Sequence, residues 1–312
     1  MENLVNGLHH VTALASDPQA NVEFYTGLLG LRLVKRTVNF DAPEVYHLYY
    51  GNADGSPGTI MTFFPYVGLP RGRAGTGQAS STAFSIPERS IEFWLDRLAS
   101  RGVEHHGPEG RFDEAVITLH DQDGLALELV ASAGDRREPW ENGDIPPEHG
   151  IRGFHSVTLM EEGYEKTAGL VTTLMDHHLV AEKGNRFRYA SGTERPGHFI
   201  DLVCAPESRR GLQGAGTVHH VAFSARSDGD QLSVRERLAR GGFNVTPVID
   251  RNYFHSIYFR EPGNVLFEVA TNPPGFAVDE PFASLGSTLK LPPQYEPHRA
   301  AIEQGLPPLT AK

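Results

Sequence analysis

The sequence predicts an α+β fold in which one strand–helix–strand–strand–strand unit occurs four times along 312 residues. Three observations lead to this prediction. A short alternating strand motif recurs at four places, a helical pattern follows each copy, and each copy closes with β-type segments after a glycine turn. The chain also exceeds the usual size of a single hydrophobic core, so several units are expected from its length.

The first strand of each unit alternates between apolar and small or polar residues. The outer copies read "LHHVTALAS" at 8–16 and "VHHVAFSA" at 218–225, and the inner copies read "SSTAFSIP" at 80–87 and "FHSVTLM" at 154–160. Both outer copies contain a histidine doublet. Because adjacent residues of a strand point to opposite faces, we expect only one histidine of each doublet to face a given cavity.

A helical pattern follows each of these strands. The first, "DPQANVEFYTGLLGL" at 17–31, has Asp17 as its expected N-cap and Gly30 near its end. The other three are "ERSIEFWLDRLASRG" at 88–102, "EEGYEKTAGLVTTLMD" at 161–176 and "GDQLSVRERLARGG" at 229–242. The doublets His105–His106 and His177–His178 come after two of these helices, and we predict that they are loop residues.

The last strand of each unit follows a glycine turn, as in "GTIMTFFP" at 58–65 and "GNVLFEVATN" at 263–272. The stretch 134–150 is rich in charge, proline and glycine and separates two halves of two units each. We therefore predict an N-terminal pair of units at 1–133, a linker at 134–150, a C-terminal pair at 151–276 and an extended tail at 277–312.

Composition excludes several classes of function. The chain has 28 basic and 39 acidic residues, a net charge of −11, which argues against nucleic acid as a partner. It contains no long apolar run and no signal-peptide pattern, so we expect a cytoplasmic protein without a membrane partner. The single cysteine, Cys204, cannot form an intrachain disulfide.

The repeated unit resembles the βαβββ module of the vicinal oxygen chelate superfamily, which includes glyoxalases, bleomycin-resistance proteins and extradiol dioxygenases. The resemblance covers about residues 5–275. It implies that pairs of modules close into cup-shaped half-barrels, and that a metal is held by residues of the first and last strands. Four modules imply two cups.

Aligning the units identifies candidate metal ligands. His10 aligns with Thr82, Ser156 and His220 in the first strands, and Thr62 aligns with Glu128, Asp201 and Glu268 in the last strands. His10, His220 and Glu268 form the two-histidine, one-carboxylate set typical of non-heme Fe(II) oxygenases, and Mn(II) accepts the same set. The second cup has no histidine at these positions, so we do not expect it to bind a transition metal.

The resemblance is most specific to ring-cleaving dioxygenases acting on hydroquinones, which also draw their histidines from the first and fourth modules. In those enzymes a histidine precedes each metal-binding histidine, as His9 and His219 do here. A tyrosine stands ten residues before the glutamate and an arginine seventeen before it, as Tyr258 and Arg251 do. The resemblance implies an enzyme that binds a small aromatic substrate and O2.

Each of these residues has an expected role. His9 or His219 accepts the substrate's phenolic proton, or else only orients the neighbouring ligand by a hydrogen bond. Tyr258 donates a proton during ring opening, and Arg251 stabilises negative charge. The alternative is that both residues have only structural roles, Tyr258 as a residue that favours strands and Arg251 in a surface salt bridge.

Two other functions fit the same fold. One is a glyoxalase-like lyase or isomerase that uses Zn²⁺ or Ni²⁺; it usually needs a fourth protein ligand, and Thr62 stands at that position. The other is a resistance protein that binds an aromatic drug without turnover. The sequence leaves the substituents of the aromatic ring and the formation of a homo-oligomer open.

Overall fold

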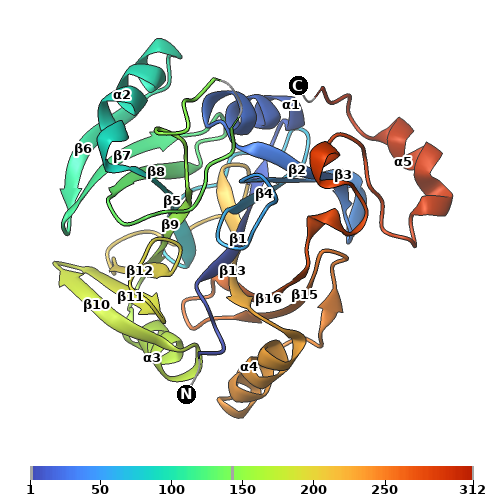
Figure 1. Cartoon of the computed structure of the whole chain (residues 1–312). Coiled ribbons are helices and arrows are strands. Elements are labelled where there is room, and N and C mark those ends of the chain that lie inside the picture. The colour runs from blue at the N-terminus through green and yellow to red at the C-terminus, as the bar shows by residue number, and fades with distance from the viewer. Residues whose placement is uncertain (1–2, 142–143, 311–312) are drawn as a thin grey trace.

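The computed structural model describes residues 3–141 and 144–310, and it contains the four predicted βαβββ units (Figure 1). Units one and four supply the first of two sheets, and units two and three the second. In order along the chain, unit one comprises β1 (Leu8–Ala15), α1 (Pro18–Val22), β2 (Arg32–Asn39), β3 (Ala42–Gly51) and β4 (Ile60–Pro65), and unit two comprises β5 (Gln78–Pro87), α2 (Ile91–Ser100), β6 (His105–Arg111), β7 (Glu114–His120) and β8 (Ala126–Ser132). Unit three comprises β9 (Gly153–Glu161), α3 (Glu165–Leu174), β10 (His177–Lys183), β11 (Arg186–Ser191) and β12 (Phe199–Cys204), and unit four comprises β13 (Thr217–Ala225), α4 (Asp228–Arg240), β14 (Ile249–Asp250), β15 (Phe254–Arg260) and β16 (Leu266–Pro274).

Each sheet has eight strands and curls into a cup, which confirms the predicted α+β fold. The strand order of the first sheet is β14-β15-β16-β13-β1-β4-β3-β2, and that of the second is β10-β11-β12-β9-β5-β8-β7-β6. The first strands of two units pair antiparallel at the centre of each sheet, β1 with β13 and β5 with β9. Each cup therefore combines one unit from each half of the chain. The segment boundaries at 133, 150 and 276 stay a prediction.

The helices lie around the outside of the two sheets (Figure 1). Asp17 caps α1 as predicted, because its carboxylate accepts from the main-chain N–H groups of Gln19 and Ala20. The regular α-helix ends earlier than predicted, at Val22, and continues as a π-helix over Glu23–Leu28. In the described part of the chain, no helix has the length and apolar character that a bilayer crossing requires.

The prediction that two histidine doublets lie in loops was wrong. His105 and His177 are the first residues of β6 and β10. In both cases the ring Nδ1 lies within hydrogen-bond distance of a main-chain carbonyl two residues earlier, at 2.9 Å for His105 and 2.6 Å for His177. Each histidine thus closes the short turn that joins a helix to the next strand.

The C-terminal segment packs on unit one. Its main chain bridges to β2, where Lys290 donates to the Arg36 carbonyl at 2.9 Å. Lys35 of β2 is fully buried beneath it, and its ammonium lies 2.6 Å from Asp279 and 2.7 Å from Glu280. A buried ammonium needs such partners, because an unpaired charge is costly to remove from water. The segment thus completes the outer wall of the first cup.

A buried carboxyl lies where the two cups meet. Glu161, at the end of β9, is 1% exposed, and its Oε1 has no hydrogen-bond partner among the described residues. It lies against Gly263 in the turn before β16, near the buried Glu261. Burial and the charge of Glu261 raise the pKa of Glu161 from 4.5 to about 8. The folded protein therefore holds a proton on Glu161 at neutral pH.

We expect the Glu161→Gln variant to be more stable than the parent at pH 8.5 and about equally stable at pH 5. Between pH 4.5 and 8 the folded state keeps a proton that the unfolded state releases, so parental stability falls as pH rises, by at most about 1.4 kcal/mol per pH unit. Glutamine mimics the protonated acid and removes this slope. Urea unfolding midpoints at both pH values measure the effect, and an equal shift at the two pH values contradicts it.

Candidate metal centre

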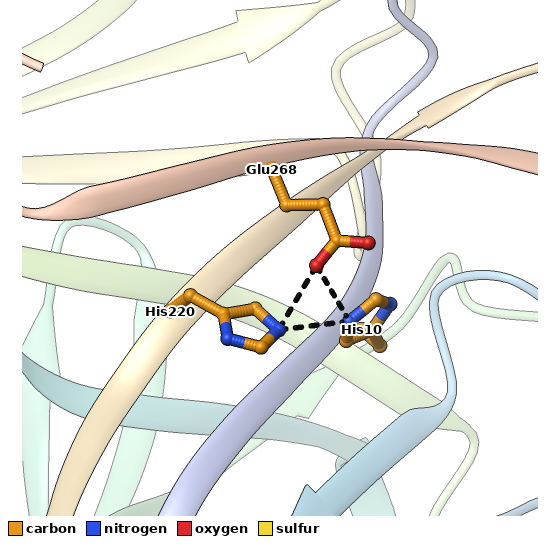
Figure 2. Close-up of side chains that lie close together, drawn as sticks. All are labelled: His10, His220 and Glu268. Atoms are coloured by element: carbon orange, nitrogen blue, oxygen red, sulfur yellow. Dashed lines mark hydrogen bonds and ion pairs between the residues drawn. The ribbon is translucent and has the colours of Figure 1, made fainter. Parts of the chain in front are cut away.

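The pairing of the central strands brings the three predicted ligands together (Figure 2). His10 lies on β1 and His220 on β13, which are antiparallel neighbours, and Glu268 lies on β16, which runs parallel to β13 on its other side. The two Nε2 atoms are 3.1 Å apart. Glu268 Oε2 lies 3.3 Å from His10 Nε2 and 3.0 Å from His220 Nε2.

The chemistry of these atoms fits a bound metal ion. All three side chains are buried, and Glu268 is fully inaccessible. Ser256 donates its hydroxyl to Glu268 Oε1, whereas Oε2 faces the two imidazole nitrogens and has no other polar partner among the described residues. Two imidazole nitrogens and one carboxylate oxygen thus converge within 4.8 Å of one another. Within residues 3–141 and 144–310 no other group of three such side chains is close enough to share an ion.

Two β-bulges explain the histidine doublets. Along β1 and β13 the register runs from Leu8↔Phe223 to His10↔Ala222, which leaves His9 as the extra residue on β1. It shifts again between Thr12↔His220 and Ala13↔Val218, which leaves His219 as the extra residue on β13. Simple alternation had placed the two histidines of a doublet on opposite faces. The bulges instead bring both rings of each doublet together.

Each extra histidine contacts the ligand beside it. His9 Nδ1 lies 2.9 Å from His10 Nδ1, and His219 Nδ1 lies 2.8 Å from His220 Nδ1. For Nε2 of a ligand to offer a lone pair to a metal, the ring proton must sit on Nδ1 and be donated to the neighbouring histidine. A metal bound at both Nε2 atoms would place the ring proton of each ligand on Nδ1, where the neighbouring histidine lies close enough to accept it.

The two extra histidines differ in their access to substrate. His219 lines the cavity beside the ligands, whereas His9 is buried and does not. Burial and the adjacent ligand lower the pKa of each to about 3, so both are neutral at pH 7. With Nδ1 accepting, the second nitrogen of a neutral ring carries a proton. His219 is thus positioned to donate a hydrogen bond, and a proton-acceptor role for either residue stays a prediction.

We expect the His9→Phe variant to bind metal about 10- to 100-fold more weakly than the parent, the usual effect of losing a partner that orients a ligand. Phenylalanine fills the same space beside Phe254 but cannot accept the His10 proton. A competition titration with a metal-binding dye measures the affinity. If His9→Phe instead slows turnover with unchanged metal affinity, His9 takes part in proton transfer and the orienting role is wrong.

The ligands face a cavity of about 360 Å³, a volume suited to one small molecule. Its walls combine aromatic and aliphatic side chains with polar groups beside the ligands, on β3 and at Asn39, Asp41 and Tyr66. The lining residues are His10, Leu14, Asn39, Phe40, Asp41, His47, Tyr49, Phe64, Tyr66, His219, His220, Arg251, Phe254, Tyr258 and Leu266.

Tyr258 and Arg251 both line this cavity and contact each other. Arg251 Nε donates to the Tyr258 hydroxyl at 3.3 Å, and the guanidinium also lies 3.3 Å from the exposed carboxylate of Asp41. Burial and the charge of Glu268 raise the pKa of Tyr258 well above its usual value. Tyr258 is therefore protonated at neutral pH, which a proton donor requires.

Sequence reasoning missed two polar cavity residues on β3, although it had singled out Thr62 beside them. His47 and Tyr49 of β3 line the cavity, and they connect through hydrogen bonds to Thr62 of β4 and Thr12 of β1. The signal was available, because Tyr49 pairs with Thr62 in the sheet and His47 lies two residues away on the same face. Alternation along "VYHLYYG" at 45–51 places His47 and Tyr49 on one face of a strand and could have identified both from the sequence.

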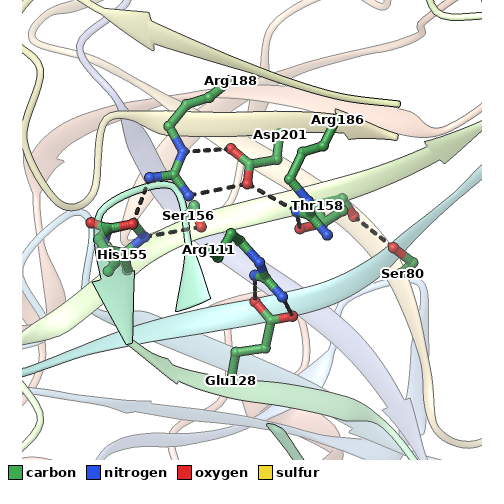
Figure 3. A network of polar contacts seen from close by, with 10 residues as sticks. Ser80, Arg111, Glu128, His155, Ser156, Thr158, Arg186, Arg188 and Asp201 are labelled. Carbon is green, nitrogen blue, oxygen red and sulfur yellow. Dashed lines mark hydrogen bonds and ion pairs between the residues drawn. The ribbon is translucent and has the colours of Figure 1, made fainter. Parts of the chain in front are cut away.

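The corresponding positions of the second cup form a network of ion pairs (Figure 3). Arg111 binds both oxygens of Glu128, at 2.5 and 2.8 Å. Asp201 accepts from Arg186 at 2.9 Å and from Arg188 at 2.8 and 3.1 Å. The carboxylates that align with Glu268 are therefore paired with arginines.

Comparison with known proteins identifies the family. The model of the Glyoxalase/Bleomycin resistance protein/Dioxygenase superfamily matches residues 7–129 and 153–269. This chain belongs to that superfamily. The match covers all four units and confirms the family predicted from the sequence.

Two full-length relatives within the superfamily are named for ring cleavage. MhqO of Bacillus subtilis, named as a candidate ring-cleaving dioxygenase, is 47% identical over 306 residues, which are 98% of this chain and 97% of MhqO. The chlorohydroquinone/hydroquinone 1,2-dioxygenase of Sphingobium indicum is 34% identical over 302 residues, which are 94% of this chain and 93% of that enzyme. The expectation of an enzyme of the ring-cleaving dioxygenase class is thereby confirmed.

Solved structures from the superfamily show the same architecture. The crystal structure of a candidate dioxygenase from Bacillus subtilis matches with a TM-score of 0.96 at 46% identity, covering 100% of this chain and 99% of that one. Glyoxalase I from Zea mays matches with a TM-score of 0.65 at 14% identity, covering 85% of this chain and 92% of that one. At so low an identity the maize structure shows a shared fold alone.

Proposed function

We propose that this protein is a non-heme Fe(II) dioxygenase that opens a hydroquinone-like aromatic ring. The observation that carries the proposal is the buried His10–His220–Glu268 group on one side of a cavity with aromatic walls. Three protein ligands on one face leave coordination positions for substrate and O2. The names of the full-length relatives support the same reaction class.

In the proposed reaction, O2 is the oxidant and both of its atoms enter the product. The carbon–carbon bond beside a hydroxylated ring carbon breaks together with the O–O bond, and no other reductant is consumed. The ion, Fe(II) or alternatively Mn(II), supplies a Lewis acid for the substrate's phenol and a source of electron density for O2. The protein's contribution is to hold the ring and to place protons and charge around it.

The apolar and the polar residues of the cavity have separate roles in the proposed reaction. Phe40, Phe64 and Phe254 form apolar walls that fit the faces and edges of one aromatic ring. On the polar side, His219 donates a hydrogen bond to an oxygen near the ligands. The Tyr258 hydroxyl, held by Arg251, is the proton donor to the oxygen that becomes negative when the ring opens.

We expect Tyr258→Phe to lower kcat by about 100- to 1,000-fold while leaving the metal content unchanged, because one preorganised donor is lost. Tyr46→Phe is the matched control. Tyr46 lies on β3 with its hydroxyl bound to the Pro307 carbonyl, and it does not line the cavity. Oxygen-electrode rates normalised to bound metal provide the measurement, and equal rates for Tyr258→Phe and the parent contradict the role.

The geometry gives less support to a glyoxalase-like lyase. Thr62 occupies the position of that class's fourth ligand, and its hydroxyl is 3.0 Å from Thr12 and 2.7 Å from His47. A threonine hydroxyl engaged in this way is a poor replacement for a carboxylate ligand. A resistance protein that only binds drugs has no need for three converging ligands.

Anaerobic reconstitution tests the proposal. The purified protein is loaded with Fe(II), Mn(II), Zn²⁺ or Ni²⁺ in parallel, and O2 uptake is followed with hydroquinones and catechols. We expect uptake with Fe(II) and a hydroquinone, with a ring-opened product that carries both atoms of ¹⁸O2. Stoichiometric zinc without O2 uptake on any dihydroxybenzene favours the lyase, and tight aromatic binding without metal favours the resistance protein.

Three further expectations accompany this function and stay predictions. They are a cytoplasmic location, the absence of a nucleic-acid or membrane partner, and a homo-oligomeric state left open by the sequence. Gel filtration with light scattering determines the last of these.

A further inference from the structure

A second cavity lies where the two cups meet the segment that follows β8. Its volume is about 660 Å³, against 360 Å³ for the metal cavity, and the two cavities share no lining residue. Its walls come from separate parts of the chain, near Leu8, Gly58, Asp135 and Gly197 and at the ends of β13 and β16. Four of the lining residues are arginines, so we call this cavity the arginine cleft.

Arg137 joins the walls of the arginine cleft. Its guanidinium binds both oxygens of Asp135 at 2.6–3.2 Å, and it donates to the carbonyls of Gly58 at 3.1 Å and Phe154 at 2.6 Å. Gly197 allows this close approach, because its φ is +88° and a Cβ there would lie 3.0 Å from Arg137 Nη1. Among the described residues Asp135 is the only acid that lines the cleft, and Arg137 neutralises it.

A histidine holds the guanidinium of Arg195. Arg195 Nε donates to His198 Nε2 at 3.0 Å, and His198 Nδ1 lies 2.7 Å from the Ser191 carbonyl. The ring is therefore neutral with its proton on Nδ1, and burial lowers its pKa in agreement. The two Nη groups of Arg195 have no hydrogen-bond partner among the described residues. They form the planar pair of donors that recognises a carboxylate or a phosphate.

Two arginines give the cleft uncompensated positive charge. Arg136 and Arg195 are exposed, and neither forms an ion pair within the described part of the chain. The glutamates nearest to them in sequence, Glu138 and Glu194, lie within ion-pair distance of other residues. A concave surface with such an excess of positive charge attracts anions.

The other polar side chains of the cleft do not cancel this charge. They are Asn6, Ser224, Arg226 and Asn272. Arg226 pairs with Asp230 at 3.2 Å. Ser224 donates to the amide oxygen of Asn272 at 2.7 Å, which leaves the amide nitrogen of Asn272 as a further donor.

We propose that the arginine cleft binds a small molecule with a doubly charged oxyanion group, either a phosphoryl group or a pair of carboxylates. The Nη pair of Arg195 supplies two charge-assisted hydrogen bonds, Arg136 a second positive charge and Asn272 a neutral donor. The volume leaves room for a ligand larger than the oxyanion itself. This inference is independent of the proposed function, since none of these residues lines the metal cavity.

Calorimetric titration tests the inference without O2 or an aromatic substrate. The purified protein, with the metal content it has on isolation, is titrated at one fixed low ionic strength with inorganic phosphate, with succinate and with the neutral analogue succinamide. We expect at least one of the two anions to bind with a Kd below about 1 mM and succinamide not to bind. The anion that binds more tightly identifies the class of ligand.

Three variants locate the bound anion. Arg136→Gln and Arg195→Gln should each weaken its binding by at least about tenfold, the usual contribution of a hydrogen bond to a charged group. Arg209→Gln is the matched control, because Arg209 is exposed and lies outside the cleft, and its replacement removes the same charge. We expect this variant to keep the parental affinity.

Several results would overturn the inference. They are a Kd above about 1 mM for both anions, equal binding of succinamide, and parental affinity in both Arg136→Gln and Arg195→Gln. An equal loss of affinity in Arg209→Gln shows a general attraction between charges and also overturns it. Circular dichroism of each variant identifies any loss that comes from misfolding, and the double variant of Arg136 and Arg195 then measures the remaining affinity.

Discussion

The Glu268→Gln variant is expected to lose its metal and its ring-cleaving activity together. Glutamine keeps the shape of the side chain but removes the negative charge from the oxygen that lies 3.0 and 3.3 Å from the two imidazoles. We expect metal affinity to fall by more than about 100-fold, beyond the range typical of residues that only orient a ligand. Metal analysis after dialysis and O2 uptake on the same sample measure both losses.

Glu128→Gln is the matched control for this substitution. Glu128 aligns with Glu268 in the repeat, lies on the last strand of its own unit and is buried, but its partner is Arg111. We expect this variant to keep the parental metal content and activity per folded molecule. Retention of both properties by Glu268→Gln as well shows that the metal is held elsewhere.

The Asp201→Ala variant is expected to be strongly destabilised without loss of metal. Asp201 is fully buried and its carboxylate neutralises Arg186 and Arg188 in the second cup. Without Asp201, Arg186 loses this ion pair and Arg188 keeps the carboxylate of Glu114, and breaking a buried ion pair typically costs about 3–5 kcal/mol. A lower urea midpoint with full metal content in the folded fraction is the expected result.

Glu194→Ala is the control for Asp201→Ala. Its carboxylate pairs with His178 at 3.2 Å, but both side chains are about half exposed. Exposed pairs contribute little, so we expect a change within about 0.5 kcal/mol. If Asp201→Ala unfolds at the same urea concentration as the parent, water or another carboxylate compensates the positive charge of the arginines. The ion-pair network then does not stabilise the fold.

The two cups show how one fold gives two different interiors. At the aligned positions the first cup has His10, His220 and Glu268, and the second has Thr82, Ser156 and Glu128. Histidines beside a carboxylate make a ligand set, whereas a carboxylate beside arginines makes an ion pair. The second cup therefore has the composition of a structural support.

Much of the site could be predicted from the sequence because the relevant signals are local and repeated. Alternation within each first strand separates cavity-facing from core-facing residues, and in β13 the alternate residues Val221 and Phe223 belong to the buried core. The aligned positions hold in three dimensions, since Thr62 and Glu268 each lie opposite the residue two places after the aligned histidine. The residue types at the aligned positions, two histidines and one glutamate, then identified the candidate ligand set.

Features that depend on how strands pair were not predictable in the same way. A β-bulge is a property of two strands in register, so no pattern within "LHHV" or "VHHV" shows that His9 and His219 turn toward the ligands. The ion pairs of Arg111 and Arg188 also join residues from different strands. The burial of Lys35 likewise depends on the distant C-terminal segment, which supplies its partners Asp279 and Glu280.

The sequence by itself determined the repeated unit, the α+β fold and the three ligand candidates, because each follows from periodicity and residue type. The tertiary structure alone decided that each doublet brings its two rings together and that His47 and Tyr49 line the cavity. The physical reason is that these features are contacts between segments far apart in the chain, and their geometry is set by sheet register and packing.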